Sequence, residues 1–498
     1  MTEPKMSEEH VELDLLSCAV RVADMIETHE GYAEAMSVIA SRYAAIEDVE
    51  RAANLADTID DPYVRDKTLS EIALRADELD QRDFALDLLS SVDEVSFQTL
   101  AIGQIAVRAA EKGDYDAALE IASDLDDPSA TQADIALKLA DAGEISRAKE
   151  IISAIEYAGS RAYAYNELAS KHLQAGRKEE AINSLVTALA AIDRIDFPDE
   201  QVSTLIESAN KHIEAELTDK AMALLDQAQE ICEGLEEGTS RDSLLSNLAL
   251  IHARLGRFEK ANECLDDISD PMQAVSCLVG IATEHKRAGE TDKAIELLDE
   301  AFEISTSADL FLARSVYQRN NLLANMAVRY ADLDQYEKAI NAAKAIDSDE
   351  VRRAALTEMA MFYARKGELE TMRQTASEIE DVYARSLCYL HLSVELSALS
   401  QDEEAFNLLE ESKSLAQQIE HGYHKAVAFA EISERYRARE LNDVADDLLF
   451  QSLSLAPKIN DRYEVALLLT QLSARYEGAG KEIGEKEKEI IEDVIIHL

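Results

Sequence analysis

The sequence predicts an all-α solenoid, a stack of helix pairs, and three observations support that fold class. Gly and Pro number only 16 and 6, Trp is absent, and residues of low strand propensity continue without a break, which is a helical profile. A chain of 498 residues is too long for one ordinary core, whereas a repeat array grows without a single core. A small residue also recurs along the whole chain.

The recurring small residues define thirteen units, and we call these residues the anchors. They are Ala40, Ala73, Ala106, Ala136, Ala169, Ala209, Ala249, Ala282, Ala327, Ala360, Ser393, Ser433 and Ser473. The intervals between neighbouring anchors fall into a shorter and a longer class, and both classes recur along the chain. Twelve positions after each anchor stands a second Ala, except that Met372 and Glu485 follow Ala360 and Ser473. This regularity predicts one structural unit per anchor.

Each unit is predicted to be helix A, a tight turn and helix B. A large apolar residue precedes most anchors by four positions, so both lie on one face of helix A. Small residues on both helices let the two backbones approach closely. The longer units exceed the shorter ones by two helical turns, which predicts a longer helix B that keeps its packing face. Seven positions after an anchor, where helix A ends in a left-handed turn, a Gly often stands: Gly113, Gly143, Gly176, Gly256, Gly289 and Gly367.

This pattern resembles the tetratricopeptide repeat, which has a small-residue pair at this spacing and a similar period. The resemblance covers nearly the whole chain. It implies a right-handed superhelix of about twelve to thirteen helix-turn-helix repeats with a groove lined by the A helices. The chain departs from the family in lacking its early Trp and in rarely placing Pro where a repeat closes, so it is identified as a divergent member.

Four parts are predicted along the chain. Residues 1–10 form a disordered tail, and residues 11–30 form helix B of an incomplete first repeat, because Ala19 and Ile26 fit that register. Residues 31–478 form the repeat array, and residues 479–498 form a capping helix with a charged outer face. The longest interval between anchors carries an insertion between Ala301 and Arg314, which predicts a longer helix or a projecting loop as a place for a hinge or a partner contact.

Acids at the end of helix B stand five positions before an arginine in four units. The pairs are Asp60 with Arg65, Glu156 with Arg161, Asp347 with Arg352, and Glu380 with Arg385. We expect ion pairs at these linkers that help to set the angle of the next repeat, each contributing about 0 to 1 kcal/mol.

The formal net charge of −51, together with 47% hydrophobic residues, indicates a folded body coated with acid. Adaptation to high salt explains such a surface, which would indicate a halophilic host with an acidic proteome. The alternative is an acidic surface that meets a basic partner. Nucleic acid is not an expected ligand, because phosphate recognition requires a basic stripe and none is visible.

The cysteines and the start of the chain indicate a cytoplasmic protein. The five cysteines are widely spaced and form no C-x-x-C pair, so we expect buried, reduced thiols rather than disulfides or a zinc site. Residues 1–10 lack the apolar core of a signal peptide, and no apolar stretch is long enough to span a membrane.

Motifs of catalysis and cofactor binding are absent from the sequence. There is no phosphate-binding Gly-rich loop, no G-x-S-x-G, no H-E-x-x-H and no calcium loop, so we predict a non-catalytic protein without cofactor or metal. His172, His212, His252 and His285 each stand three positions after an anchor. Such a row could bind metal or sense pH. Because the same position holds Tyr in other repeats, we favour packing between repeats.

The predicted function is a scaffold or adaptor that binds a partner peptide or helix in the groove. Amides suit an extended peptide backbone, bases suit its carboxylates, and the resemblance implies that Asn247 and Asn325 hold the main chain. The candidate partner-binding residues are Asn166, Asn210, Asn247, Arg254, Lys286, Arg287, Asn321 and Asn325. A regulatory protein that binds a small ligand in the groove and a self-assembling structural protein are the alternatives. The partner and the oligomeric state are not indicated.

High salt should stabilise the purified protein. Repulsion among the surface carboxylates is screened over a few ångströms in molar salt, so the thermal midpoint should rise by several degrees and the radius of gyration should fall relative to about 0.1 M salt. Circular dichroism and small-angle scattering measure both. Equal stability and compactness in the two buffers would favour the basic-partner explanation.

Overall fold

The computed structural model describes residues 14–307 and 316–497, and every regular element in these residues is helical. The predicted all-α solenoid of helix pairs is therefore confirmed. Within the same residues, no helix combines the length and the apolarity needed to cross a bilayer. The expected tail lies outside the described residues.

One anchor lies on each A helix, and a B helix follows each of the first twelve. The A helices are α2 (His29–Ala45), α4 (Pro62–Glu78), α6 (Val95–Glu111), α8 (Ser129–Asp141), α10 (Ala158–Gln174), α12 (Pro198–Glu214), α14 (Thr239–Arg254), α16 (Pro271–Arg287), α19 (Val316–Asp332), α21 (Asp349–Lys366), α23 (Val382–Ala398), α25 (Gly422–Ala438) and α27 (Arg462–Gly478). The B helices that follow are α3 (Val49–Ala56), α5 (Arg82–Leu89), α7 (Tyr115–Ala122), α9 (Ile145–Ala154), α11 (Lys178–Ile192), α13 (Thr218–Glu233), α15 (Phe258–Asp266), α17 (Thr291–Thr306), α20 (Tyr336–Lys344), α22 (Leu369–Ser377), α24 (Asp402–Gln418) and α26 (Asn442–Leu453).

The helix crossings are as tight as the small residues predict. All anchors except Ser473 are at most 3% exposed, and the second Ala of every unit that has one is completely buried. The large apolar residues on either side, such as Leu69 and Ile72 on α4, are also buried and fill the space between neighbouring pairs.

The turn after helix A is left-handed in all thirteen units. Gly256, seven positions after Ala249, has a φ of +73°, and the same position in other units holds non-glycine residues such as Glu216 at +62°. This conformation costs an L-residue roughly 1–2 kcal/mol. The repeat geometry therefore fixes the turn even where its sequence does not favour it.

The long units extend helix B as predicted: α11 and α13 have 15 and 16 residues, whereas α3 and α5 have 8 each. In the longest interval, α17 has 16 residues and is no longer than α13. Residues 308–315 of the expected insertion lie outside the described residues.

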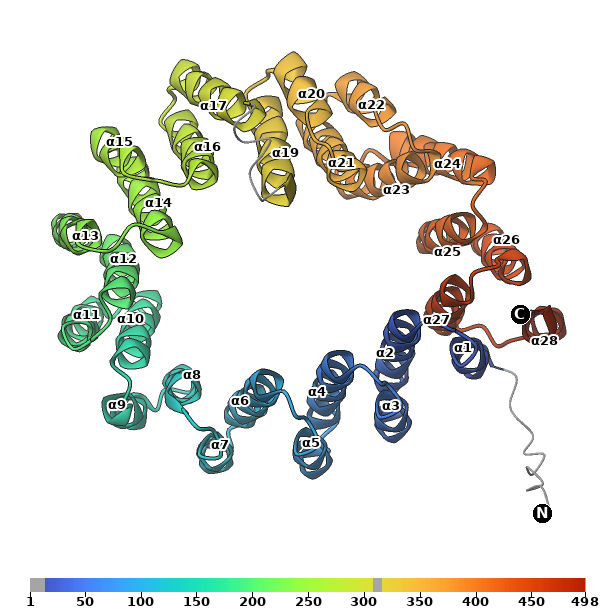
Figure 1. Cartoon of the computed structure of the whole chain (residues 1–498), viewed down its shortest axis with the longest axis horizontal. Coiled ribbons are helices and arrows are strands. Elements are labelled where there is room, and N and C mark those ends of the chain that lie inside the picture. Colours follow the sequence, from blue (N-terminus) through green and yellow to red (C-terminus); the bar gives the residue numbers. More distant parts are fainter. Residues whose placement is uncertain (1–13, 308–315, 498) are drawn as a thin grey trace. The chain divides into compact units, whose positions relative to one another are not determined.

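The contacts divide the chain into two compact units. Unit 1 consists of residues 1–102 and 363–498, and unit 2 of residues 103–362. Unit 2 contains α7 to α20, and unit 1 contains α1 (Leu15–Ala23) to α5 and α22 to α28 (Glu485–His497); the boundaries fall inside α6 and α21. Figure 1 shows these elements.

The two ends of the chain meet in unit 1. Helix α1 packs against α27 in the position that a B helix takes in the other repeats, and it also contacts α2 (Figure 1). The C-terminal helix α28, expected as the cap, contacts η1 (Ala456–Lys458), α1 and α26, with Ile491 and Val494 buried. Helix α1, predicted as helix B of an incomplete first repeat, therefore serves as helix B of the last repeat, whose helix A is α27.

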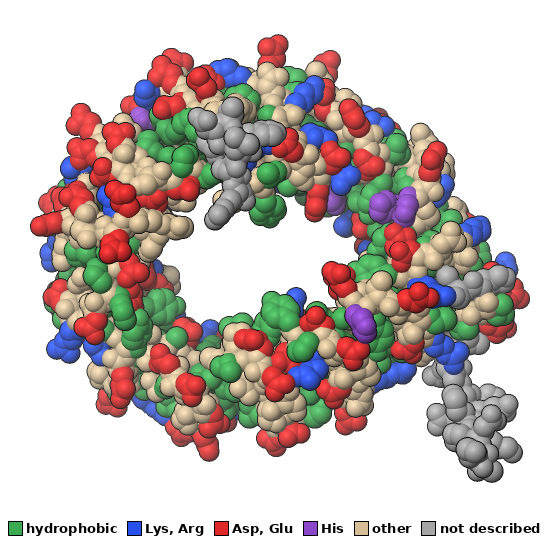
Figure 2. Space-filling model, in the orientation of Figure 1, with side chains coloured by type: hydrophobic (Ala, Val, Ile, Leu, Met, Phe, Trp, Pro, Cys, Tyr) green, Lys and Arg blue, Asp and Glu red, His purple; other side chains and the backbone are tan. Residues whose placement is uncertain are grey.

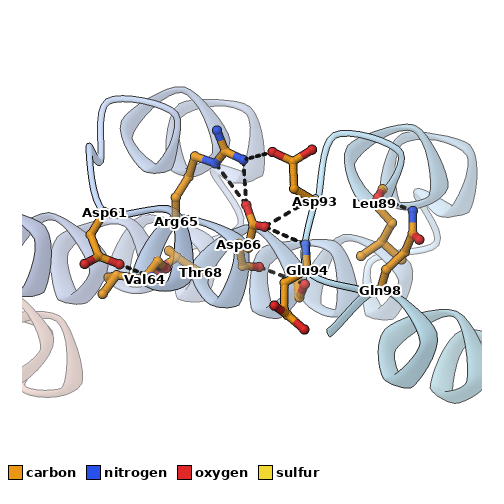
Figure 3. A network of polar contacts seen from close by, with 10 residues as sticks. Asp61, Val64, Arg65, Asp66, Thr68, Leu89, Asp93, Glu94 and Gln98 are labelled. Atoms are coloured by element: carbon orange, nitrogen blue, oxygen red, sulfur yellow. Dashed lines mark hydrogen bonds and ion pairs between the residues drawn. The ribbon is translucent and has the colours of Figure 1, made fainter. Parts of the chain in front are cut away.

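On some A helices a buried side chain forms hydrogen bonds with the backbone of the linker that follows helix B of the same repeat. The carboxylate of Asp66 accepts the backbone N–H groups of Asp93 and Glu94 at 2.9 and 2.8 Å, and the Arg65 guanidinium bridges the carboxylates of Asp66 and Asp93 (Figure 3). The Arg65 and backbone hydrogen bonds outweigh the effect of burial, so the pKa of Asp66 is lowered. The same two positions hold Arg241 and Asp242 on α14, where Asp242 accepts the N–H groups of Ser269 and Asp270, and Arg319 and Asn320 on α19, where Asn320 accepts the N–H of Asp347.

The prediction that acids at the end of helix B pair with the arginines five positions later is wrong. Arg161, Arg352 and Arg385 instead donate to the backbone carbonyls of the large apolar residues that close helix B, at 2.6, 2.9 and 3.3 Å. Arg65 bonds to Asp66 and Asp93 rather than to Asp60. The last carbonyls of a helix have no partner within the helix, so a guanidinium is more useful there than beside a solvated carboxylate.

Replacing Gly256 with Ala should destabilise the α14–α15 pair by about 1 kcal/mol. The added Cβ would have no atom within 4 Å, so the cost is that of the left-handed backbone alone. Gly478→Ala, in the helical conformation and in equally open space, is the control and should be neutral or stabilising by up to about 1 kcal/mol. Native-state hydrogen exchange of both segments measures the effect, and equal protection after Gly256→Ala would contradict the left-handed turn.

Candidate partner-binding groove

The A helices of unit 2 form a continuous surface. Helices α8, α10, α12, α14, α16 and α19 each contact the next in this order, and Figure 1 shows them on the concave side of unit 2, with the B helices on the other side. Acidic side chains are spread over the molecular face in Figure 2, with Lys and Arg scattered among them.

A pocket of about 490 Å³ lies where α14, α16 and α19 meet on this surface. Because its walls come from three successive A helices, it belongs to the groove and not to the B-helix side. Its polar lining is mostly amides and hydroxyls, with Met272 and Leu322 as apolar members. We call it the amide pocket, and its main polar side chains are those of Thr239, Gln273, Ser276, Gln318, Asn321 and Asn325.

The two carboxylates that line the amide pocket, those of Asp242 and Asp270, accept hydrogen bonds from backbone N–H groups. Asp242 is buried and accepts the N–H groups of Ser269 and Asp270 at 3.2 and 2.8 Å. Asp270 caps α16 by accepting the N–H of Gln273 at 2.9 Å. Both carboxylates already hold backbone N–H groups, which leaves the amides to make contacts with a ligand.

Two amides on α19 face the pocket one helical turn apart. Asn321 and Asn325 are both exposed, and the Asn325 carbonyl accepts the Arg329 Nε–H at 3.2 Å. The side chains of Asn321 and Gln273 form no hydrogen bond with any other described residue. An amide offers both a donor and an acceptor, so this surface can pair with the C=O and N–H of an extended peptide.

The other predicted amides are not gathered here. Asn247 is exposed on α14 and Asn210 is half-buried on α12, both outside the amide pocket. Asn166 is completely buried, and its Oδ1 and Nδ2 have no hydrogen-bond partner in the described part of the chain. It stands three positions before its anchor, whereas Asn247 and Asn325 stand two before theirs, and one residue turns a side chain by about 100°. Asn166 therefore cannot line the groove.

The predicted basic cluster is largely neutralised by acids. Lys286 pairs with Asp332 of the next A helix, and Arg287 pairs with Glu284 of its own helix at 2.5 Å. Only Arg254, exposed at the end of α14, has no ion pair with a described residue. These bases lie at the C-terminal ends of their helices and do not line the amide pocket.

Acids in the groove are a feature that the sequence analysis missed. Asp134, Glu167 and Glu207 stand two positions before successive anchors, as Asn325 does, and burial together with the charges of these three acids raises the pKa of the Tyr163 hydroxyl. Burial, then the charge of Glu167, raises the pKa of the Glu207 carboxyl, and burial raises that of Asp134. Lys211 offsets part of the charge, 2.7 Å from Glu167. The anchor spacing could have found these acids.

The four histidines are buried packing residues. His285 stacks on Phe258 with ring centroids 3.8 Å apart, and the His212 ring bonds to the Ser208 carbonyl at 2.8 Å. Burial lowers the pKa values of His172, His212 and His252. Within the described residues no three His, Cys, Asp or Glu side chains are placed to hold a metal ion.

The chain matches no known family model and no curated protein. Among solved structures, it is similar to Ton1535 from Thermococcus onnurineus NA1, at 16% identity over 73% of this chain and 99% of that one, with a TM-score of 0.27. The human IFIT1 dimer with PPP-AAAA is 14% identical over 91% and 96%, with a TM-score of 0.28. Aspartyl phosphate phosphatase F from Bacillus subtilis is 13% identical over 91% and 96%, with a TM-score of 0.29. TM-scores this low do not superpose the sites, so the groove is interpreted from its own residues.

The His252→Tyr variant should lose part of the pH dependence of stability. Burial lowers the pKa of His252 to about 4, against about 6.5 in an unfolded chain. The unfolded state therefore binds the proton more tightly, and stability that is complete above pH 6.5 falls as the pH drops toward 4, on the order of 3 kcal/mol.

Urea unfolding of both proteins at pH 7.5 and 5 measures this difference. Tyr occupies the same position in other repeats, as at Tyr330, so the ring should be accommodated. An identical change in stability with pH in the two proteins would show that His252 is not buried as a neutral ring.

Proposed function

We propose that this protein is a non-catalytic scaffold or adaptor that binds an extended segment of a partner protein along the A-helix groove of unit 2. The observation that carries the proposal is the amide pocket, where Gln273, Asn321 and Asn325 converge from two helices. Buried backbone groups of a bound peptide need hydrogen-bond partners, and side-chain amides supply both donors and acceptors.

The lining of the pocket favours a peptide over a small ligand. Sites for small molecules are mostly apolar with a few polar groups, whereas this pocket is polar and has only Met272 and Leu322 as apolar side chains. Helix α12 contacts α14, and α10 contacts α12, so an extended chain that leaves the pocket along this surface would meet further A helices.

The charge of the groove determines which segments it accepts. Glu167 and Glu207 lie on the neighbouring A helices, and Lys286 and Arg287 are paired with acids. A strongly acidic segment would be repelled, and nucleic acid would be repelled for the same reason. The preferred partner is a neutral or basic segment.

The repeat is best assigned to a divergent tetratricopeptide type, and its setting to the cytoplasm of a salt-adapted cell. The tetratricopeptide assignment is supported by the thirteen anchors, eleven of which are followed by a second Ala twelve positions later. Five free and buried cysteines support a reducing compartment, and the net charge of −51 supports high salt.

The double variant Asn321→Ala with Asn325→Ala should weaken peptide binding about 10-fold or more, because each lost hydrogen bond costs about 0.5–1.5 kcal/mol. Random dodecapeptides displayed on phage are selected at molar salt, and the dissociation constants of the selected peptides are measured by titration. Asn341→Ala, an exposed Asn on the B helix α20, is the matched control and should leave binding unchanged.

Three results would contradict the proposal. Selection could yield no saturable binder, the double variant could bind as tightly as the wild type, or the control could weaken binding equally. Selected peptides rich in Asp and Glu would contradict the charge preference alone.

A further inference from the structure

The last A helix, α27, obtains its B helix from the other end of the chain. Its anchor, Ser473, has Glu485 instead of a small residue twelve positions later, whereas Ala19 of α1 is a small B-helix residue without an anchor before it. The sequence separation of Ala19 from the anchor Ala40 equals that of Ala52 from the anchor Ala73. Ala19 is therefore the missing second small residue of the last repeat.

The contacts at this junction are those of an ordinary repeat junction. Helix α1 packs on α27 as a B helix on its A helix, α1 contacts α2 as a B helix contacts the next A helix, and α2 contacts α27 as successive A helices do. The Arg462 guanidinium donates to the Met25 carbonyl at 2.7 Å, and the Tyr463 hydroxyl donates to the Glu34 carboxylate at 2.8 Å. Arg42 also pairs with Glu477.

This junction differs from the others in having no peptide linkage between its two helices. Helix α1 has nine residues, is joined to the array only through residues 24–28, and buries Leu15, Leu16, Ala19 and Val22. An isolated helix of this length is not stable in water, so α1 depends on the surface of α27.

The junction is also incompletely filled. A cavity of about 700 Å³ lies at the N-terminal end of α1, lined by Leu15 and Leu16, by Ser473 and Tyr476 of α27, and by side chains of α2 and of residues 477–488. Ser473 is the one anchor that is not fully buried. Solvent therefore reaches Ser473 at the edge of this crossing although Ala19 is buried, which lowers the cost of separating the two helices relative to the interior junctions.

We propose that residues 14–28 form a clasp that detaches from α27 as a unit while the other repeats stay folded. The open face of α27 is then a docking site for the α1 segment of a second copy. The site requires a small residue at the crossing and apolar residues at the positions of Leu16 and Val22. A second copy docked in this way would join head to tail.

The variant Ala19→Asp tests the clasp in the full chain. It places a carboxylate at the completely buried crossing, whereas the control Arg21→Asp places one on the exposed face of the same helix. Hydrogen exchange should accelerate at least 10-fold in α1 and in α27 for Ala19→Asp, with α8 to α16 unchanged, and Arg21→Asp should match the wild type. Acceleration throughout the chain, or none in α27, would overturn the proposal.

A synthetic peptide of residues 14–28 tests the docking site. The fluorescently labelled peptide should bind the Ala19→Asp protein saturably and the wild type at least 10-fold more weakly, and the same peptide with Ala19→Asp should not bind. Equal binding to both proteins, or no binding to the variant, would refute the site. If Ala19→Asp lowers the total helicity, Val22→Ala replaces it in both measurements, because Val22 is also completely buried.

Discussion

Close approach of two helix backbones at a pair of small residues is the constraint on which the rest of the structure depends. Ala40 and Ala52, and their equivalents along the chain, leave so little space between helix A and helix B that only one crossing fits. That crossing fixes the turn seven positions after the anchor, and Glu216 adopts a left-handed conformation to follow it. It also fixes which face of each A helix of unit 2 points into the groove.

The sequence predicts what repeats locally and misses what depends on distant pairing. The anchors and Gly256 locate the helices and turns because each signal lies within one unit. The pairing of α1 with α27 has no local signature, although the unmatched Ala19 and Glu485 are both visible in the sequence. The sequence predicts that each linker arginine pairs with an acid close to it in the sequence. In the structure three of these arginines donate to backbone carbonyls at the end of helix B, as Arg161 does, and the sequence does not show that these carbonyls lack a partner.

The candidate groove is predicted only in part from the sequence, and the reason is angular. Asn321 and Asn325 reach the same pocket because they are one turn apart on the correct face. Asn166 is one residue out of phase and is buried. Lys286 and Arg287 look like free charges in the sequence, but a chain with this excess of acid supplies each of them with a carboxylate. Acids such as Glu207 make the groove negative, but they do not stand out in a sequence with so many acidic residues.

The sequence separation of 437 residues between Met25 and Arg462 has a consequence for synthesis. Each interior repeat can fold as it leaves the ribosome, since its two helices emerge together. Helix α1 is made before its partner α27, which emerges about 20 to 90 seconds later at roughly 5–20 residues per second. During that time Leu15, Leu16 and Val22 lack the α27 surface that helps to bury them in the folded chain, so this segment stays open to chaperones for longer than the helices of the interior repeats.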